Sequence, residues 1–223
     1  SSIGFVKGRD YPDSNAKLKS INYGFTFNRN NSFREYFAGN GLNATNSYVD
    51  YFAAQANDSA NSGRTIDFLK NNAPFCYESA LASASSLITN TSSIDFMPVF
   101  NAGLIRQSVV SYQKGNQFDF TFSVGGNVND KFYWGGALFG QYFRVNYTNT
   151  YKESDEKDTI DIFNNFTFTT NSNMVGFGVG FQLGGIYVPR SDWRLGLSAR
   201  SRTNAAVSET FSTSLESNLF LFG

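Results

Sequence analysis

The sequence predicts an all-β protein built from antiparallel strands, and three observations support this fold class. Aromatic residues make up 17% of the chain, and Phe and Tyr favour the pleated, half-buried surface of a sheet. Charged residues make up only 16%, against roughly 25% in soluble domains. In several segments apolar residues also alternate with polar or very small ones, which is the periodicity of a strand.

The first half of the chain contains three expected strands. Residues 2–8 form a short strand, and in residues 18–28 Ile21, Tyr23 and Phe25 alternate with polar or small residues. Residues 105–127 are expected to form one strand with a kink near Gly115, and its second half has Phe at every other position from 118 to 122.

The second half contains four more expected strands, at 132–147, 174–188, 193–201 and 217–222. The clearest is 174–188, where bulky apolar residues occupy every other position from Val175 to Leu183 and glycines occupy most positions between them. Trp193, Leu195 and Leu197 continue this alternation in the next strand. The total is therefore about seven strands.

The expected connections alternate between short and long. Those at 9–17, 127–131 and 189–192 are short, and those at roughly 29–104, 148–172 and 202–216 are long and polar. Short turns on one side and long loops on the other are typical of a membrane barrel. A hairpin within 105–127 would weaken this argument.

The region 30–104 is expected to be a long extracellular loop that contains helices. Ser47 is a candidate N-cap for a helix over 47–56, with Asp50 completing a capping box, and Asn46 is the other candidate cap. A second helix is expected within 78–90.

Alternation alone does not decide whether the apolar face points inward or outward. A soluble barrel turns it inward around a ligand, whereas a membrane barrel turns it toward lipid. The glycines opposite the apolar positions and the length of the strands favour a transmembrane β-barrel. The residues expected to face its lumen are Asp119, Gln182, Arg194 and Arg200. Such charges hold a ligand's carboxylate or a plug in the lumen, or they only pair across neighbouring strands.

Composition argues against enzymatic chemistry and against cofactors. The chain has no His, which removes the usual catalytic triads, zinc sites and haem ligand. The net charge is zero and no basic stripe is present, so nucleic acid is not an expected partner. The single cysteine, Cys76, has no partner for an internal disulfide.

Residues 123–135, 176–189 and 193–197 resemble strands and turns of the FadL/TodX outer-membrane transporters of Bacteroidetes. Residues 3–6 and 23–29 also fit this pattern. The resemblance implies a fourteen-stranded barrel in the bacterial outer membrane, a hatch that plugs its lumen, and passive uptake of fatty acids or hydrocarbons. About seven strands cannot close such a barrel, and the hatch with its Asn-Pro-Ala motif is absent. We therefore expect a single partial barrel domain over residues 1–223.

In this family, helices of the extracellular loops are thought to offer a hydrophobic surface that binds the ligand. The corresponding aromatic candidates here are Phe33, Tyr36, Phe37, Tyr48, Tyr51 and Phe52. The alternative is that these rings only pack the loop onto itself. The expected partners are membrane lipid and a hydrophobic small molecule, with an outer-membrane protein as a further partner. Two alternatives remain open. The protein is an assembly or secretion partner without transport, or it is a soluble β-protein that binds a hydrophobic ligand.

Overall fold

The computed structural model describes residues 1–13, 16–58, 77–92, 95–101 and 103–220. Most of these residues lie in antiparallel strands, so the all-β fold class is confirmed. Cys76 lies outside the described residues. None of the helices described is long and apolar enough to cross a bilayer.

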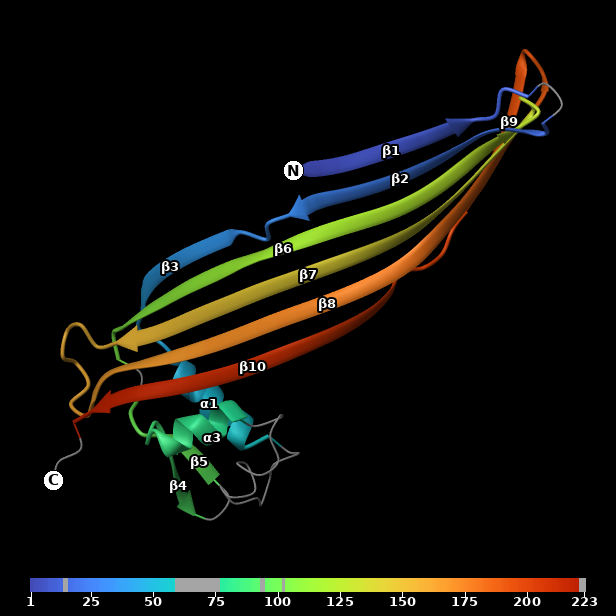
Figure 1. The fold of residues 1–223 in the computed structure, drawn as a ribbon. Coiled ribbons are helices and arrows are strands. Elements are labelled where there is room, and N and C mark those ends of the chain that lie inside the picture. The colour runs from blue at the N-terminus through green and yellow to red at the C-terminus, as the bar shows by residue number, and fades with distance from the viewer. Residues whose placement is uncertain (14–15, 59–76, 93–94, 102, 221–223) are drawn as a thin grey trace. The chain divides into compact units, whose positions relative to one another are not determined.

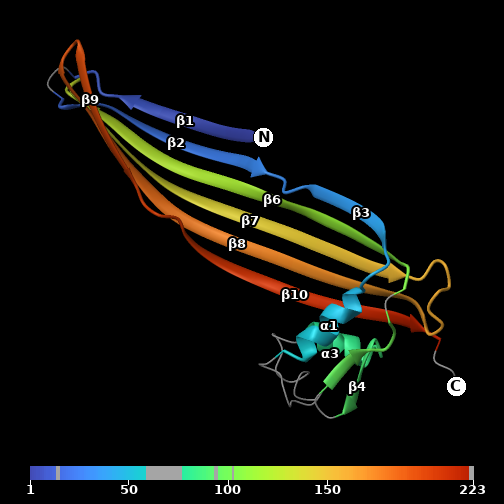
Figure 2. The same ribbon diagram turned by 180° about the vertical axis from the view of Figure 1, so that it is seen from behind.

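Eight strands form the main sheet, and six of them follow one another across it in the order β1-β2-β6-β7-β8-β10 (Figures 1 and 2). β3 pairs with β6, and β9 pairs with β8. Their bounds are β1 Ser2–Asp10, β2 Leu18–Asn31, β3 Glu35–Asn43, β6 Ile105–Val128, β7 Phe132–Ser154, β8 Phe163–Arg190, β9 Trp193–Arg200 and β10 Asn204–Leu219. The path begins at β1 and ends at β10, so the sheet formed by the described residues is not closed.

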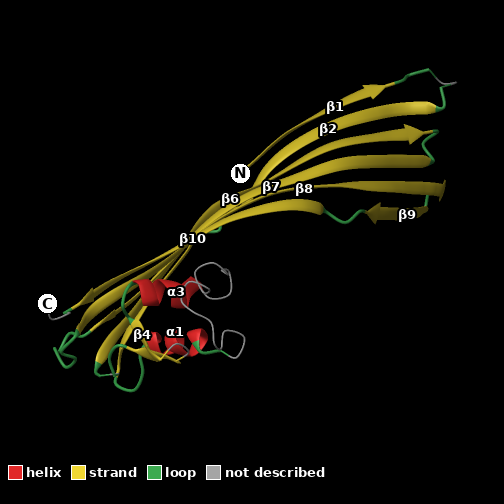
Figure 3. Ribbon diagram, turned by 90° about the horizontal axis from the view of Figure 1, so that it is seen from below, coloured by secondary structure: helices red, strands yellow, loops and turns green. Residues whose placement is uncertain are grey.

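The chain divides into two units that share the long strands. Unit 1 comprises Ser1–Arg34, Gln113–Asn146 and Ser172–Thr210, and unit 2 comprises Glu35–Tyr112, Tyr147–Asn171 and Phe211–Gly223. Unit 2 holds α1 (Tyr48–Ala56), α3 (Tyr77–Ala84) and a hairpin of β4 (Ile88–Ser92) and β5 (Asp95–Pro98). Figure 3 shows the two helices and this hairpin gathered together within unit 2.

Several expectations are confirmed by the strands. Residues 105–127 do form one strand, because β6 runs without interruption from Ile105 to Val128. The short connections after β1, β6 and β8 lie where they are expected. The helix expected over 47–56 is α1, and Ser47 caps it with the predicted capping box. The second expected helix is α3, which begins at Tyr77.

The expected long loops are wrong in three places. Residues 204–219 form β10, whose Ser- and Thr-rich face made this segment look like a polar loop. The connection expected at 148–172 shrinks because β7 extends to Ser154 and β8 begins at Phe163. The region 30–104 contains β3, in which Asn40 lies between two glycines and so obscures the alternation. The strand expected at 217–222 is the end of β10, and residues 221–223 lie outside the described part.

The buried core lies in unit 2, where the helices pack on the strands. Phe52 of α1 and Phe163 and Phe166 of β8 are almost fully buried in one cluster, together with Leu87 and Ile105. Burying large apolar side chains stabilises a fold by about 1.5–3 kcal/mol each. This cluster therefore fixes the helical segment against the sheet.

The turn between β6 and β7 provides the first testable prediction. Asn129 and Asp130 both have positive φ, of 54° and 56°, and the Lys131 N–H donates to the Val128 carbonyl at 3.2 Å. These are the features of a type I′ turn, which favours Asn followed by Gly. We expect Asp130→Gly to retain or raise the free energy of unfolding and Asn129→Val to lower it by about 1–2 kcal/mol. Urea unfolding of the two variants measures this difference, and equal effects would contradict the assigned turn.

Candidate functional site

One face of the sheet in unit 1 is apolar across five strands, and we call it the apolar face. Register pairs place Phe25 opposite Phe122 and Tyr187 opposite Leu195, so alternate residues of neighbouring strands share this face. Its large residues include Tyr23, Phe27, Phe122, Leu138, Phe177, Val179, Phe181, Leu183 and Leu197, and all of these are exposed. The alternation predicted for β2, β6, β8 and β9 is therefore present in three dimensions.

Rings on the apolar face fit around glycines of β7. A Cβ added to Gly140 would lie 2.2 Å from the ring of Phe120, and Phe120 itself stacks on Phe177 with ring centroids 5.9 Å apart. Two aromatic residues of β6 and β8 therefore meet above a glycine of the strand between them. Phe27 of β2 and Phe118 of the adjacent strand β6 also stack, with ring centroids 5.3 Å apart. The glycines of this sheet thus make room for aromatic rings.

The apolar face ends at a similar position on four neighbouring strands. Arg29 of β2 is the register partner of Phe118, the last aromatic residue of β6 on this face. On β7, Arg144 follows Tyr142 on the same face, and its Nε donates to Oδ1 of Asn173 on β8 at 3.2 Å. The next side chains on this face are Asn116 and Lys114 on β6 and Asn146 on β7, which are amide or basic.

The opposite face of unit 1, the polar face, carries a hydrogen-bonded network around Asp119. Its carboxylate accepts a hydrogen bond from Nε2 of Gln141 on β7 at 3.2 Å and another from Nδ2 of Asn30 on β2. Nε2 of Gln117 lies 3.5 Å from the same carboxylate. Asp119 therefore has partners across both neighbouring strands, which is the simpler of the two roles expected for it.

Arg200 lies on the same polar face and has an aromatic partner. Its guanidinium carbon lies 4.2 Å from the centroid of the Phe139 ring, a cation–π distance. Phe139 in turn covers Gly180, and Gln182 is the register partner of Arg200. Arg200, Phe139 and Asp119 together line a cavity of about 220 Å³. Arg194, the fourth residue expected in the lumen, is exposed on β9.

The six aromatic candidates for a loop surface do not form one cluster. Tyr48, Tyr51 and Phe52 contact one another in α1, but Phe52 is buried and only Tyr51 is largely exposed. Tyr36 and Phe37 are exposed, but they lie in β3, and Phe33 lies in the turn before it, with a φ of 44°. Of the six, Tyr48, Tyr51 and Phe52 lie in α1 and the other three do not, and a role of the six in ligand binding stays a prediction.

Tyr48 joins the helix to the strands below it. Its ring contacts Tyr151 of β7, with centroids 4.8 Å apart, and it contacts Phe52 edge-on. Burial, followed by the nearby carboxylate of Glu78, raises the pKa of Tyr48 to about 12. The raised pKa reflects the place of Tyr48 between packed rings and near a carboxylate.

A buried carboxylate that the sequence did not indicate attaches α1 to β7. Glu153 is fully buried, and its Oε1 accepts hydrogen bonds from the Tyr48 N–H at 2.8 Å, Gln107 Nε2 at 2.8 Å and the Tyr151 hydroxyl at 2.7 Å. Its other oxygen, Oε2, accepts from the hydroxyl of Ser47, the N-cap of α1. A helix N-terminus favours a negative charge, so the cap and the carboxylate support each other.

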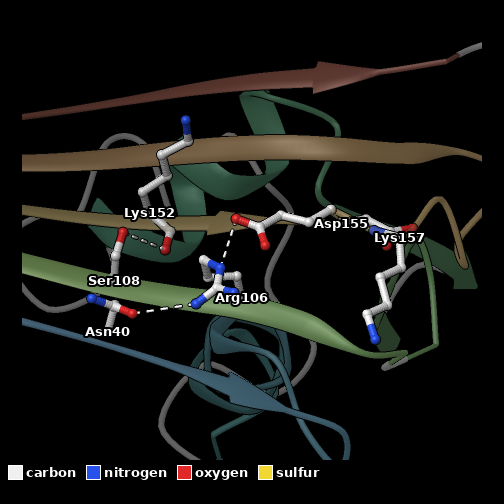
Figure 4. Close-up of polar contacts among 7 residues, drawn as sticks. Asn40, Arg106, Ser108, Lys152, Asp155 and Lys157 are labelled. Carbon is white, nitrogen blue, oxygen red and sulfur yellow. Dashed lines mark hydrogen bonds and ion pairs between the residues drawn. The ribbon is translucent and has the colours of Figure 1, made fainter.

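Figure 4 shows a second set of polar contacts in unit 2, at the surface. Arg106 of β6 forms an ion pair with Glu156 at 2.6 Å, and one of its terminal nitrogens donates to Oδ1 of Asn40 at 3.2 Å. The two charged side chains are 35% and 46% exposed. Water screens such pairs, and they contribute about 0–1 kcal/mol. This cluster therefore contributes little to stability.

Comparison of the chain with family models, with curated proteins and with solved structures finds no match. Within the described residues, no three His, Cys, Asp or Glu side chains are grouped so that they would hold a metal ion.

Proposed function

We propose that unit 1 is part of the wall of an outer-membrane β-barrel, with its apolar face against lipid and its polar face lining a passage for hydrophobic small molecules. The observation that supports this most is the limited height of the apolar face. It runs from Trp134 to Tyr142 on β7 and from Val175 to Tyr187 on β8. Strands tilted by about 45° cover about 20–30 Å over such lengths, which brackets the roughly 25 Å apolar band of membrane barrels.

The strands themselves are much longer than this band. β6 has 24 residues and β8 has 28, whereas crossing a membrane takes about 9–11. A soluble barrel that binds its ligand inside would have no reason to end its apolar face at one line while its strands continue. A lipid bilayer of fixed thickness gives that reason.

Spin labelling tests which face contacts lipid. The Cys76→Ser variant removes the only cysteine, and single cysteines are then placed at Phe122 on the apolar face and at Thr121 on the polar face. In the membrane-embedded protein, we expect a nitroxide at 122 to collide mainly with oxygen, which dissolves in lipid. A nitroxide at 121 should collide mainly with a water-soluble nickel complex. The reverse pattern would contradict the proposed orientation.

Transport itself is tested at Arg200, whose guanidinium lies in the cavity of the polar face. If this cation attracts the carboxylate of a passing fatty acid, Arg200→Gln should lower fatty-acid uptake by cells several-fold, because a charge-assisted hydrogen bond contributes about 1.5–3 kcal/mol. Uptake of an uncharged alkane should change little. Arg194→Gln, which removes an equal charge from β9, is the matched control.

Two outcomes would count against this proposal. Loss of alkane and fatty-acid uptake to the same extent in both arginine variants would show that Arg200 does not select the ligand. Normal uptake by cells that lack the protein, together with a stable co-purifying outer-membrane protein, would indicate an assembly or secretion role.

A further inference from the structure

A strongly basic groove lies in unit 1 at the edge of the apolar face. Its lining includes Arg29, Arg34, Lys114 and Arg144 together with Asn116 and Asn146, and it has a volume of about 830 Å³. Among the residues that the structure describes, no carboxylate lines it, although the chain as a whole carries equal numbers of acidic and basic residues. Four positive charges are therefore concentrated at one place on a protein with no net charge.

The groove begins where the apolar face ends. Arg29 is the register partner of Phe118, and Arg144 follows Tyr142 on the same face of β7. The side chains of Arg29, Lys114 and Arg144 are all exposed. Long basic side chains at such a border can lay their carbon stems on apolar surface and extend their charges away from it.

Irregular backbone shapes the groove. The β2–β6 register shifts between Arg29 and Asn31, and Phe33 then takes a left-handed conformation while its N–H donates to the side chain of Asn31. The N–H of Gly115 donates to the carbonyl of Ser32 at 3.0 Å. A Cβ at Gly115 would lie 2.1 Å from the carbonyl oxygen of Arg144, so only glycine lets these strands approach here. This irregularity places Arg34 beside the cations of β2, β6 and β7.

We propose that this groove binds the phosphorylated headgroup of a membrane lipid in the outer leaflet. Arginine guanidinium groups match phosphate oxygens in a bidentate manner, and four cations balance about two phosphate groups. The groove volume lies within the range of about 300–1,000 Å³ of clefts that enclose a drug-sized ligand, well above the need of one free ion. Because the groove adjoins the apolar face, a lipid whose chains lie on that face brings its phosphates to the four cations. The inference rests on the proposed membrane orientation.

The test uses the intact protein in detergent micelles and a diphosphorylated lipid A-type glycolipid as the probe, with binding measured by native mass spectrometry. The variant is the triple change Arg29→Gln, Lys114→Gln and Arg144→Gln. The control is Lys17→Gln, Arg194→Gln and Arg202→Gln, which removes the same charge elsewhere in unit 1. We expect the groove variant to lose about tenfold or more in affinity, because several charge-assisted contacts disappear, and the control variant to stay close to the wild-type affinity.

Two further probes distinguish the source of the phosphate. The same glycolipid without phosphates should bind poorly, and inorganic phosphate at matched concentration should not displace the phosphorylated lipid. Equal binding of the dephosphorylated lipid, displacement by inorganic phosphate, or an unchanged affinity in the groove variant would each overturn the proposal. Where the triple variant fails to fold, the single variants Arg29→Gln and Arg144→Gln serve in its place.

The headgroup proposal and the proposed membrane orientation can fail independently of each other. A nitroxide at residue 122 that contacts lipid, together with an unaffected groove variant, refutes only the headgroup site. A nitroxide at 122 that is shielded from lipid refutes the membrane orientation itself.

Discussion

Replacing Phe122 with Arg is expected to lower the free energy of unfolding by roughly 2–4 kcal/mol, whereas replacing its neighbour Thr121 with Arg costs less than about 1 kcal/mol. Phe122 is exposed near the middle of the apolar face on β6, opposite Phe25. In the proposed orientation, a charge there would have to enter hydrocarbon. Thr121 points to the polar face, where it lines a cavity with Asp119 and Arg200.

Urea unfolding of the protein in lipid vesicles measures both free energies. The two positions are adjacent on one strand and receive the same side chain, so the variants differ in the face that carries the charge and in the residue replaced. A larger loss at Thr121 than at Phe122 would mean that the face of Thr121, and not the apolar face, lies against apolar surroundings. That outcome would also remove the basis for transport across a membrane.

Glu153→Ala is expected to detach α1 from β7, with a loss of about 3 kcal/mol or more. The substitution removes the acceptor for four donors, from Ser47, Tyr48, Gln107 and Tyr151, in a fully buried place. Each buried donor left without a partner costs about 1–3 kcal/mol. Hydrogen exchange should rise at the start of α1, and protease cleavage between α1 and α3 should accelerate.

Glu156→Ala provides the matched control, because Glu156 lies three residues away in unit 2 but is exposed and forms an ion pair with Arg106. Its loss should cost less than about 1 kcal/mol. Glu153→Gln should fall between the two, since the amide keeps one acceptor oxygen but presents its NH₂ to a donor. Equal protease sensitivity of Glu153→Ala and Glu156→Ala would show that the buried carboxylate does not hold the helix.

Much of the sheet was predictable because side chains alternate along a strand. Where one face is consistently apolar, as from Val175 to Leu183, the period of two identifies both the strand and its faces. The same reasoning failed for β10, although Val207, Phe211 and Leu215 lie four residues apart on one face. Glu209 and Thr213 fill the positions of this face between these three, so its apolar signal is weak.

The helical segment also combines a feature that was predictable from the sequence with one that was not. The capping box of Ser47 and Asp50 is a local signal, and it correctly placed the start of α1. The buried role of Glu153 had no local signal, because the carboxylate lies in a polar run that was expected to be a loop. Its partners Ser47 and Gln107 are 106 and 46 residues away along the chain.

The sequence by itself determined the all-β class, the long strand β6, the capped helix and the two contrasting faces of β8, because each depends on neighbours a few residues apart. Only the tertiary structure decided that β3 and β10 join the sheet, that Glu153 anchors the helix and that four cations gather at the border of the apolar face. These features depend on strand pairing. Pairing brings together residues that are far apart along the chain, and a local sequence pattern does not show which of them will meet.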